Sequence, residues 1–351
     1  MDAAPPRLLS LATVVPPHRL RQRDVQGRAP AIFREDPAAV DRLMPVFANA
    51  GIESRYSCVP APWYEDDHGW PDRNALYIGA SLELLTAAAA RALAGAGLDA
   101  AAIDAIVCVS TTGIATPSLD ARLLDRLPFR RDVRRLPVFG LGCAGGVLGL
   151  ARAADMAAAR PASRGLLLVV EPCALTFRRR DRSTANIVAA ALFGDGAAAA
   201  VLSTAGDGPA IVAAGEHTWP DSASIMGWGV EADGLAVIFS RDIPQLIRSR
   251  LPAVVDDFLG RNGLTRADID RFVCHPGGAK VVDALEQALA LPPGALDHSR
   301  GVLRDFGNMS AATVLFVLER TWAVGDLRGR ALMTAVGPGF SAGFAVLETG
   351  S

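Results

Sequence analysis

A twelve-residue segment occurs twice in this chain, and the repeat limits the folds that the chain can adopt. Residues 97–108 read GLDAAAIDAIVC and residues 263–274 read GLTRADIDRFVC, so Gly, Leu, Ile, Asp, Val and Cys recur at a constant offset of 166 positions. Each copy predicts a turn followed by a short buried strand that ends in a cysteine. We therefore expect two duplicated halves, residues 1–215 and residues 216–351.

The two halves also share an alternation of helices and strands. The predicted strands are short and apolar on both faces, as in sheets that helices cover on both sides, which indicates an α/β protein. The first half is predicted to hold helices at 76–95 and 143–159 and strands at 104–110 and 165–171. The second half is predicted to hold helices at 243–260, 279–289 and 308–322 and strands at 270–275, 330–336 and 342–348.

Composition excludes several functional classes. Of the 351 residues, 21% are charged and the net charge is only −2, so no basic field attracts nucleic acid. No apolar run approaches the roughly 20 residues of a membrane span, and the N-terminus has no secretory signal pattern, so we expect a cytoplasmic protein. The five cysteines are widely spaced and odd in number, which argues against a disulfide framework or a CxxC zinc site.

One cysteine, Cys143, lies in a setting that suits a nucleophile. It stands in the segment GCAGG, where glycines permit a tight turn and a close approach of substrate. The predicted helix begins at this turn, and the free N–H groups of a helix N-terminus lower the pKa of a thiol. A buried structural cysteine is the alternative.

His275 and Asn308 are the expected partners of this thiol. His275 ends a predicted strand and precedes Pro-Gly-Gly, at the strand end where open α/β sheets bind ligands. The offset of 166 carries Cys143 to position 309, so Asn308 is expected at the matching helix start of the second half. An imidazole and an amide that donate to one oxygen would stabilise an enolate or oxyanion. The alternative for Asn308 is a helix cap, and for the other four histidines, including His217 and His298 in predicted loops, a structural role is expected.

Two further glycine turns, FGDG at 193–196 and GPGF at 337–340, each precede a strand of small residues. They resemble matching turns of the two halves. The chain has neither the GxxxxGK[ST] phosphate loop nor a GxGxxG turn between a strand and a helix, so a nucleotide cofactor is not expected.

The motifs taken together resemble the type III polyketide synthases, the chalcone and stilbene synthase family, from about residue 7 to residue 348. They are GCAGG, EPCALTFR at 171–178, ALFGDGAAAAVL at 191–202, CHPGG at 274–278, GNMSAATVLFVLE at 307–319 and GPGF. The resemblance implies a thiolase-like, five-layered αβαβα fold, a homodimer, acyl-CoA and malonyl-CoA as substrates, and no metal or organic cofactor.

The resemblance also implies roles for single residues. Cys143 would carry the acyl group, while His275 and Asn308 would hold the malonyl thioester carbonyl during decarboxylation and His275 would keep Cys143 ionised. Arg55 and Lys280 would contact the CoA phosphates, with an ordinary solvated surface charge as the alternative for both. Phe193 would gate the passage between the CoA tunnel and the acyl cavity. The residues expected to line that cavity are Thr111, Thr112, Thr116, Glu171, Cys173, Thr176, Gly227, Val237 and Ser310.

Three departures from the plant enzymes bear on the substrate. Val237 replaces a gatekeeping Phe, Thr116 replaces a methionine that reaches across the dimer, and their GFGPG is AVGPG here. Smaller side chains at these points suggest space for a long apolar chain, so we expect a medium or long fatty acyl starter and an alkylpyrone or alkylresorcinol product. An aromatic starter, or malonyl-CoA alone giving a naphthalene-type product, stays open.

Three other functions also remain as alternatives. A single condensation of the ketoacyl synthase III type would need an acyl carrier protein and a basic docking patch. A CoA-thioester-binding protein without catalysis would not need all of Cys143, His275 and Asn308. A cysteine hydrolase would need a residue that orients the base, and would release CoA without carbon dioxide.

Overall fold

A mixed β-sheet runs through the whole molecule. The computed structural model describes residues 4–32 and 44–350, and in this part of the chain nine strands form one hydrogen-bonded sheet in the order β11-β12-β13-β8-β1-β7-β6-β4-β5. The strands of the N-terminal part are β1 (Arg7–Val14), β4 (Ala105–Val109), β5 (Arg134–Val138), β6 (Arg164–Pro172) and β7 (Asp195–Ser203). Those of the C-terminal part are β8 (Ala210–Thr218), β11 (Arg271–Cys274), β12 (Arg330–Gly337) and β13 (Ser341–Glu348).

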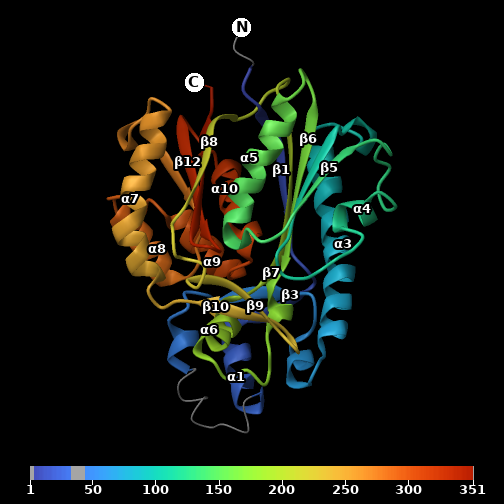
Figure 1. Cartoon of the computed structure of the whole chain (residues 1–351), viewed down its shortest axis with the longest axis vertical. Helices are drawn as coiled ribbons and strands as arrows, with labels where there is room; N and C mark the ends of the chain where they lie inside the picture. Colours follow the sequence, from blue (N-terminus) through green and yellow to red (C-terminus); the bar gives the residue numbers. More distant parts are fainter. Residues whose placement is uncertain (1–3, 33–43, 351) are drawn as a thin grey trace.

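The sheet divides into two halves between β1 and β8, which share only the pair Arg7–Ala210. Helices α5 (Gly145–Ala158) and α10 (Thr313–Ala323) contact strands of both halves and form a central layer. Helices α3 (Trp70–Gly95) and α4 (Leu119–Leu123) cover the outer face of the N-terminal half. Helices α7 (Ile243–Arg261) and α8 (Ala279–Ala288) cover the other outer face, so that Figure 1 shows helix, sheet, helix, sheet and helix from left to right.

Smaller elements close one end of these layers, below the sheets in Figure 1. The strand pairs are β2 (His18–Arg21) with β3 (Ser54–Ser57) and β9 (Met226–Glu231) with β10 (Gly234–Phe239). The helices at this end are α1 (Gln22–Ile32), α6 (Thr184–Leu192) and, towards the C-terminal half, α9 (Asp297–Phe306). Short 3-10 helices lie at Ala61–Glu65, Ala100–Ala102, Gly142–Ala144, Cys173–Thr176, Arg266–Asp268 and Ser310–Ala312.

The predicted duplication is confirmed by the order of elements. The strands β4 and β11 begin 166 residues apart, as do β6 and β12, and both β4–β6 and β11–β12 are parallel pairs. Between these strands the offset changes to 168, because the 3-10 turns Gly142–Ala144 and Ser310–Ala312 are the equivalent ones. The structural equivalent of Cys143 is therefore Ala311, and not position 309 as predicted. The proposed boundary at 215/216 falls inside β8.

The helix predicted at 308–322 is wrong at its start. The chain forms α9, then Gly307 with a φ of 72° and Asn308 in an isolated β-bridge, then the 3-10 turn, and only then α10. His298, which was placed in a loop, lies in α9, and His217 lies in β8. Helix α9 was not predicted because its sequence, DHSRGVLRDF, is mostly polar and contains few apolar residues. Val302, Leu303 and the backbone of Gly301 face the core.

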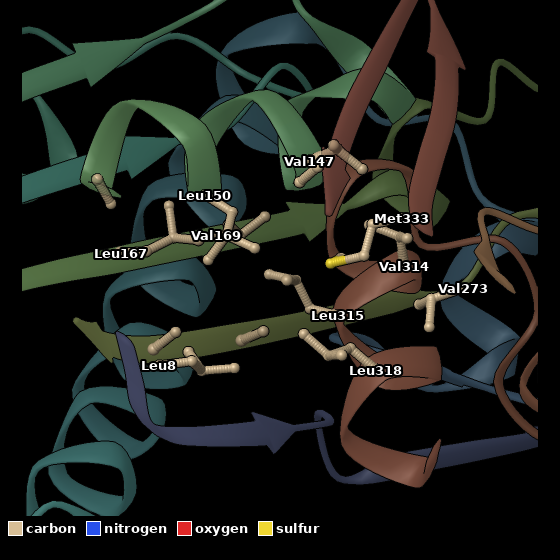
Figure 2. Close-up of a cluster of buried hydrophobic side chains, with 14 of the residues drawn as sticks. Leu8, Val147, Leu150, Leu167, Val169, Val273, Val314, Leu315, Leu318 and Met333 are labelled. Atoms are coloured by element: carbon tan, nitrogen blue, oxygen red, sulfur yellow. The ribbon is translucent and has the colours of Figure 1, made fainter. Parts of the chain in front are cut away.

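The core between the two halves holds the central helices in place. Figure 2 shows Val147 and Leu150 of α5 against Leu167 and Val169 of β6, with side chains of α10 on the other side. The two helices start in direct contact, because a Cβ added to Gly146 would lie 2.2 Å from the carbonyl oxygen of Ala311. Glycine at this point therefore lets the two pseudo-equivalent turns meet.

Helix α3 is long and apolar enough to cross a membrane, if length and composition alone are considered. It packs on β1, β6 and β7, and buried residues such as Leu85, Ala88 and Ala92 lie along its inner face. We therefore assign α3 to the core of this fold.

Candidate active site

Cys143 lies in the 3-10 turn Gly142–Ala144, directly before α5, as the sequence predicts. Gly142 has a φ of 47°, and a Cβ there would lie 2.6 Å from Cδ of Pro338. The GPGF turn thus packs against the cysteine turn, and only glycine fits at position 142. The N–H of Gly142 donates to Oγ1 of Thr111 at 3.2 Å, which joins the turn to the end of β4.

Hydrogen bonds fix both the backbone and the side chain of Asn308. Its N–H donates to the carbonyl of Leu192 at 2.8 Å, and its carbonyl accepts from the N–H of Gly194 at 3.0 Å. In the side chain, Nδ2 donates to the carbonyl of Gly277 at 3.2 Å, and Oδ1 accepts from the N–H of Ser310 at 2.8 Å. These bonds orient the amide and leave one of its two N–H groups for another acceptor.

His275 follows β11, and its backbone N–H donates to the carbonyl of Thr334 at 2.9 Å. The side chain is buried, and neither ring nitrogen has a hydrogen-bond partner among the described residues. Burial lowers the pKa of His275 to about 4, so the imidazole is neutral at physiological pH. A buried imidazole with two unpartnered nitrogens is suited to bind a polar ligand.

Asn308 connects the segments that carry the other two residues, Cys143 and His275. Asn308 reaches the Gly277 carbonyl of the His275 loop, and Asn308 and Ser310 both hydrogen-bond the thiol of Cys143. Burial nevertheless raises the pKa of Cys143 to about 12, and those hydrogen bonds offset this only in part. Burial thus outweighs the helix N-terminus, and a neutral His275 supplies no charge, so the free site does not favour an ionised Cys143, which stays a prediction.

The predicted gate residue Phe193 lies in an aromatic cluster. Trp228 packs edge-on against its ring at a centroid distance of 6.2 Å, and Phe239 does so at 5.8 Å. Val237 belongs to the same cluster and is the cross-strand neighbour of Trp228 in the β9–β10 hairpin. Sequence reasoning missed Trp228 and Phe239, which fill space beside the small Val237. The i, i+2 spacing of Val237 and Phe239 on one strand is the signal that could have found Phe239.

Two family models match the chain in succession. The model for chalcone and stilbene synthases, N-terminal domain, matches residues 66–207, and the model for the C-terminal domain matches residues 210–347. The chain belongs to the chalcone and stilbene synthase family. The predicted family, its thiolase-like five-layered fold and an acyltransferase activity are thereby confirmed.

Relatives within this family cover almost the whole chain. A protein of Streptomyces peucetius subsp. caesius named 1,3,6,8-tetrahydroxynaphthalene synthase is 42% identical over 345 residues, which are 96% of this chain and 91% of that protein. An alpha-pyrone synthesis polyketide synthase-like protein of Mycobacterium tuberculosis is 28% identical and covers 99% of this chain and 92% of its own length. The crystal structure of 1,3,6,8-tetrahydroxynaphthalene synthase from Streptomyces coelicolor A3(2), a bacterial type III polyketide synthase, has a TM-score of 0.93 at 28% identity over 98% of this chain and 99% of that one.

Glu171 is a buried carboxyl group in this type III polyketide synthase. Oε2 accepts from the N–H of Thr111 at 3.0 Å and from the hydroxyl of Thr112 at 2.8 Å, whereas Oε1 has no partner among the described residues. Burial raises the pKa of Glu171 to about 7, although these hydrogen bonds act in the opposite direction. The two threonines and the carboxyl group thus form one hydrogen-bonded unit at the ends of β4 and β6.

This raised pKa predicts a pH-dependent cost in stability. The folded protein keeps the Glu171 proton to about pH 7, whereas the unfolded chain loses it near the ordinary value of 4.5, so stability falls as the pH rises between these values. We expect Glu171→Gln to remove this loss, on the order of 1–3 kcal/mol, and to gain thermal stability over the wild type at pH 8 but not at pH 5. Thermal unfolding at both pH values measures the effect. The exposed Glu231→Gln is the control, and an equal difference at both pH values for Glu171→Gln would contradict the argument.

The remaining predicted lining residues lie in different places. Cys173 and Thr176 share the 3-10 turn after β6, where the Thr176 hydroxyl donates to the Cys173 carbonyl at 2.7 Å. Gly227 lies in β9 beside Trp228, and a Cβ there would meet nothing within 4 Å. Thr116 does not lie in the cavity of its own chain, because it is exposed in a surface pocket with Ile114 and other residues.

The two predicted CoA contacts have opposite environments. Arg55 is only 3% exposed, and its guanidinium donates to the carbonyls of Ala190 and Phe193. The burial of Arg55 contradicts the alternative of a solvated surface charge, whereas its CoA role stays a prediction. Lys280, the only lysine of the chain, is exposed in the first turn of α8, five residues after His275.

The part of the chain that the structure describes contains no group of three or more His, Cys, Asp or Glu side chains that could hold a metal ion. The site instead offers a thiol, an imidazole and an amide. Such groups can carry an acyl group and stabilise negative charge on a carbonyl oxygen.

Proposed function

We propose that this type III polyketide synthase extends a medium or long fatty acyl group with malonyl-CoA and forms an alkylpyrone or alkylresorcinol. The acyl group is carried on Cys143, and His275 and Asn308 act on malonyl-CoA. The observation that carries the choice of starter is an apolar cavity beside the candidate site. Its buried end is formed by Cys173, Ala189 and Phe193.

This cavity extends from the site towards the surface. Apolar side chains of α1 and of the neighbouring segments line it, and Arg28 lies at its exposed end; the lining includes Val25, Ala29, Ile32, Phe47, Tyr64 and Phe177. A lining of this kind lowers the free energy of a bound hydrocarbon chain by removing apolar surface from water, by about 0.8 kcal/mol for each buried methylene. A short polar starter has no hydrocarbon chain to bury in this cavity and would not gain this free energy.

The chemistry follows from the groups present. The Cys143 thiol attacks the acyl-CoA carbonyl and passes its proton to the neutral His275. The bond to the CoA sulfur then breaks, His275 returns the proton to that sulfur, and CoA leaves as a thiol. Malonyl-CoA then loses carbon dioxide, and the enolate oxygen accepts hydrogen bonds from His275 and from the free N–H of Asn308. The enolate carbon attacks the Cys143 thioester, which frees the thiolate and gives a chain two carbons longer.

Starter and product are tested together by one set of incubations. Purified protein is incubated with labelled malonyl-CoA, alone and with acyl-CoAs of increasing chain length, and the products are identified by mass. We expect the fastest product formation with medium or long fatty acyl-CoA. Absence of carbon dioxide release and of any Cys143 adduct with every acyl-CoA would contradict the proposed chemistry.

A second product class is favoured by one observation. The relative that is 42% identical is named as a 1,3,6,8-tetrahydroxynaphthalene synthase, and Trp228 and Phe239 reduce the space beside Phe193. Malonyl-CoA as both starter and extender is therefore the second candidate. A naphthalene-type product from malonyl-CoA alone, with no stimulation by fatty acyl-CoA, would select it.

The role of the apolar cavity predicts the effect of filling it. Ala174 lines the cavity, and only its backbone takes part in hydrogen bonds: its N–H donates to Asp195 and its carbonyl accepts from the N–H of Phe177. We expect Ala174→Phe to shorten the longest starter that the enzyme accepts by several carbons, because the ring occupies the volume of the tail. The chain-length profile of product formation measures this. Ala174→Ser is the control at the same position, and an unchanged profile for Ala174→Phe would contradict the role of the cavity.

We also propose a homodimer and a phosphate contact at Lys280. Strand β5 is the last strand at its end of the sheet, and Ile114, Leu136 and Phe139 are exposed beside it, with Phe139 60% exposed. An unpaired strand edge with apolar neighbours is suited to pair with a second copy, and a single-chain mass in solution would contradict this.

Lys280, the proposed phosphate contact, lies close in sequence to His275 and is free to meet an anionic substrate. The protein is expected to act in the cytoplasm.

A further inference from the structure

The C-terminal end of α6 leads directly into the gate residue Phe193, and its last carbonyls need partners from outside the helix. The carbonyl of Ala190 accepts from Nη1 of Arg55 at 2.6 Å, and the carbonyl of Ala191 accepts from Nε2 of Gln22 at 3.0 Å. The carbonyl of Leu192 accepts from the N–H of Asn308 at 2.8 Å. Two buried side chains and the predicted catalytic asparagine thus satisfy three consecutive carbonyls.

Arg55 and Gln22 form one unit in this arrangement. Nη2 of Arg55 donates to Oε1 of Gln22 at 2.9 Å, and Nη1 also donates to the carbonyl of Phe193 at 3.0 Å. Burial lowers the pKa of Arg55 to about 10, so the guanidinium stays charged at neutral pH. A positive charge at a helix C-terminus is stabilised by the helix dipole, which compensates in part for the burial of this charge.

Arg55, which lies in β3, is also close to two segments that each contain a glycine. A Cβ added to Gly194 would lie 3.2 Å from Cβ of Arg55, and a Cβ added to Gly307 would lie 3.3 Å from the same atom. Gly194 follows Phe193, and Gly307 precedes Asn308. Both segments therefore pass close to Arg55, and they are joined by the parallel bridge between Phe193 and Asn308.

We infer that Arg55 and Gln22 are positioning residues, which hold the Phe193–Asn308 bridge and so aim the Asn308 amide at the malonyl thioester. They act through the backbone carbonyls of Ala190, Ala191 and Phe193. This inference rests on the proposed role of Asn308 in decarboxylation. Cys143 lies on a different segment, at the start of α5, and Ser310 also hydrogen-bonds its thiol, so we expect acyl loading to depend little on this bridge.

The test separates loading from decarboxylation. In Arg55→Lys one ammonium group replaces the guanidinium fork. In Gln22→Met the three side-chain hydrogen bonds of Gln22, to Phe47, Ala191 and Arg55, are lost at similar volume. For each folded variant, acylation of Cys143 is followed by mass, and decarboxylation by release of carbon dioxide from malonyl-CoA. We expect acylation to stay within about 3-fold of the wild type and decarboxylation to fall about 10-fold or more, since a displaced amide no longer meets the developing charge.

The control is Arg7→Lys, because Arg7 also donates to a backbone carbonyl, that of Gly208, but at the distant junction of β1 and β8. A merely structural role would lower both rates of the Arg55 and Gln22 variants in parallel. Parallel losses, or rates equal to those of the wild type, would overturn the inference. If Arg55→Lys does not fold, Gln22→Met decides between these outcomes. A wild-type protein that does not decarboxylate malonyl-CoA would instead overturn the proposed function.

Discussion

Cys143→Ala is expected to abolish acyl loading at this position and to lower product formation by at least about 10³-fold, because the thiol proposed to form the thioester is lost. The structure places this thiol between the GPGF turn and Asn308, next to the start of α5. Intact-protein mass after incubation with acyl-CoA measures loading directly. The protein should still fold, since the substitution removes one sulfur atom from a site that Gly142 and Gly145 already shape.

A second buried cysteine serves as the control for this substitution. Cys108 lies in β4, and burial raises its pKa, so Cys108→Ala removes an equivalent thiol from the core. It should load acyl groups like the wild type. Loading of Cys143→Ala at the wild-type rate would remove Cys143 from its role, whereas loss of loading in both variants would indicate a general structural effect.

Asn308→Ala is expected to leave acyl loading almost unchanged and to lower the decarboxylation of malonyl-CoA by about 10²-fold, as for the loss of one donor to a developing oxyanion. The backbone bonds of Asn308 to Leu192 and Gly194 persist in this variant, so the bridge to Phe193 stays intact. Only the amide is lost, and with it the hydrogen bonds to Gly277, to Ser310 and to the Cys143 thiol. Acyl-enzyme mass and carbon dioxide release separate the two steps.

Asn262→Ala is the matched control, because that asparagine donates to the carbonyl of Phe258 at the end of α7 and lies in another part of the fold. Both steps should continue in it at the wild-type rate. Equal loss of loading and decarboxylation in Asn308→Ala would contradict a role specific to the enolate. Unchanged decarboxylation would assign the enolate to His275 alone.

Local sequence was sufficient where a feature depends on neighbours along the chain. The glycine turn at Cys143, the strand that ends at His275 and the duplicated order of elements were all predicted, and the structure contains them. The start of the helix after Asn308 was not predicted correctly. The residues between α9 and α10 do not continue a helix, because Asn308 hydrogen-bonds the backbone of Leu192 and Gly194. The predicted equivalent of Cys143 was also wrong, because the repeat offset was taken from the strands. The turns that connect the strands are shifted by two further residues.

The sequence did not predict the environment of several single side chains. Arg55 was predicted to bind phosphate, yet it is buried against the carbonyls of α6. Trp228 and Phe239 were not predicted, although they pack against Phe193. An ionised Cys143 was expected from its helix N-terminus, whereas its complete burial raises its pKa to about 12.

The sequence by itself determined the family, the two-half α/β plan and the identity of the three candidate catalytic residues, because turns, periodic apolar patterns and motifs are written in contiguous residues. Tertiary structure alone decided which groups are desolvated and which backbone carbonyls they meet. Cys143, Asn308 and Arg55 come from segments that are far apart in the chain, and burial and hydrogen bonding between such segments set their charge state and orientation. These quantities depend on distances in space, which spacing along the chain does not contain.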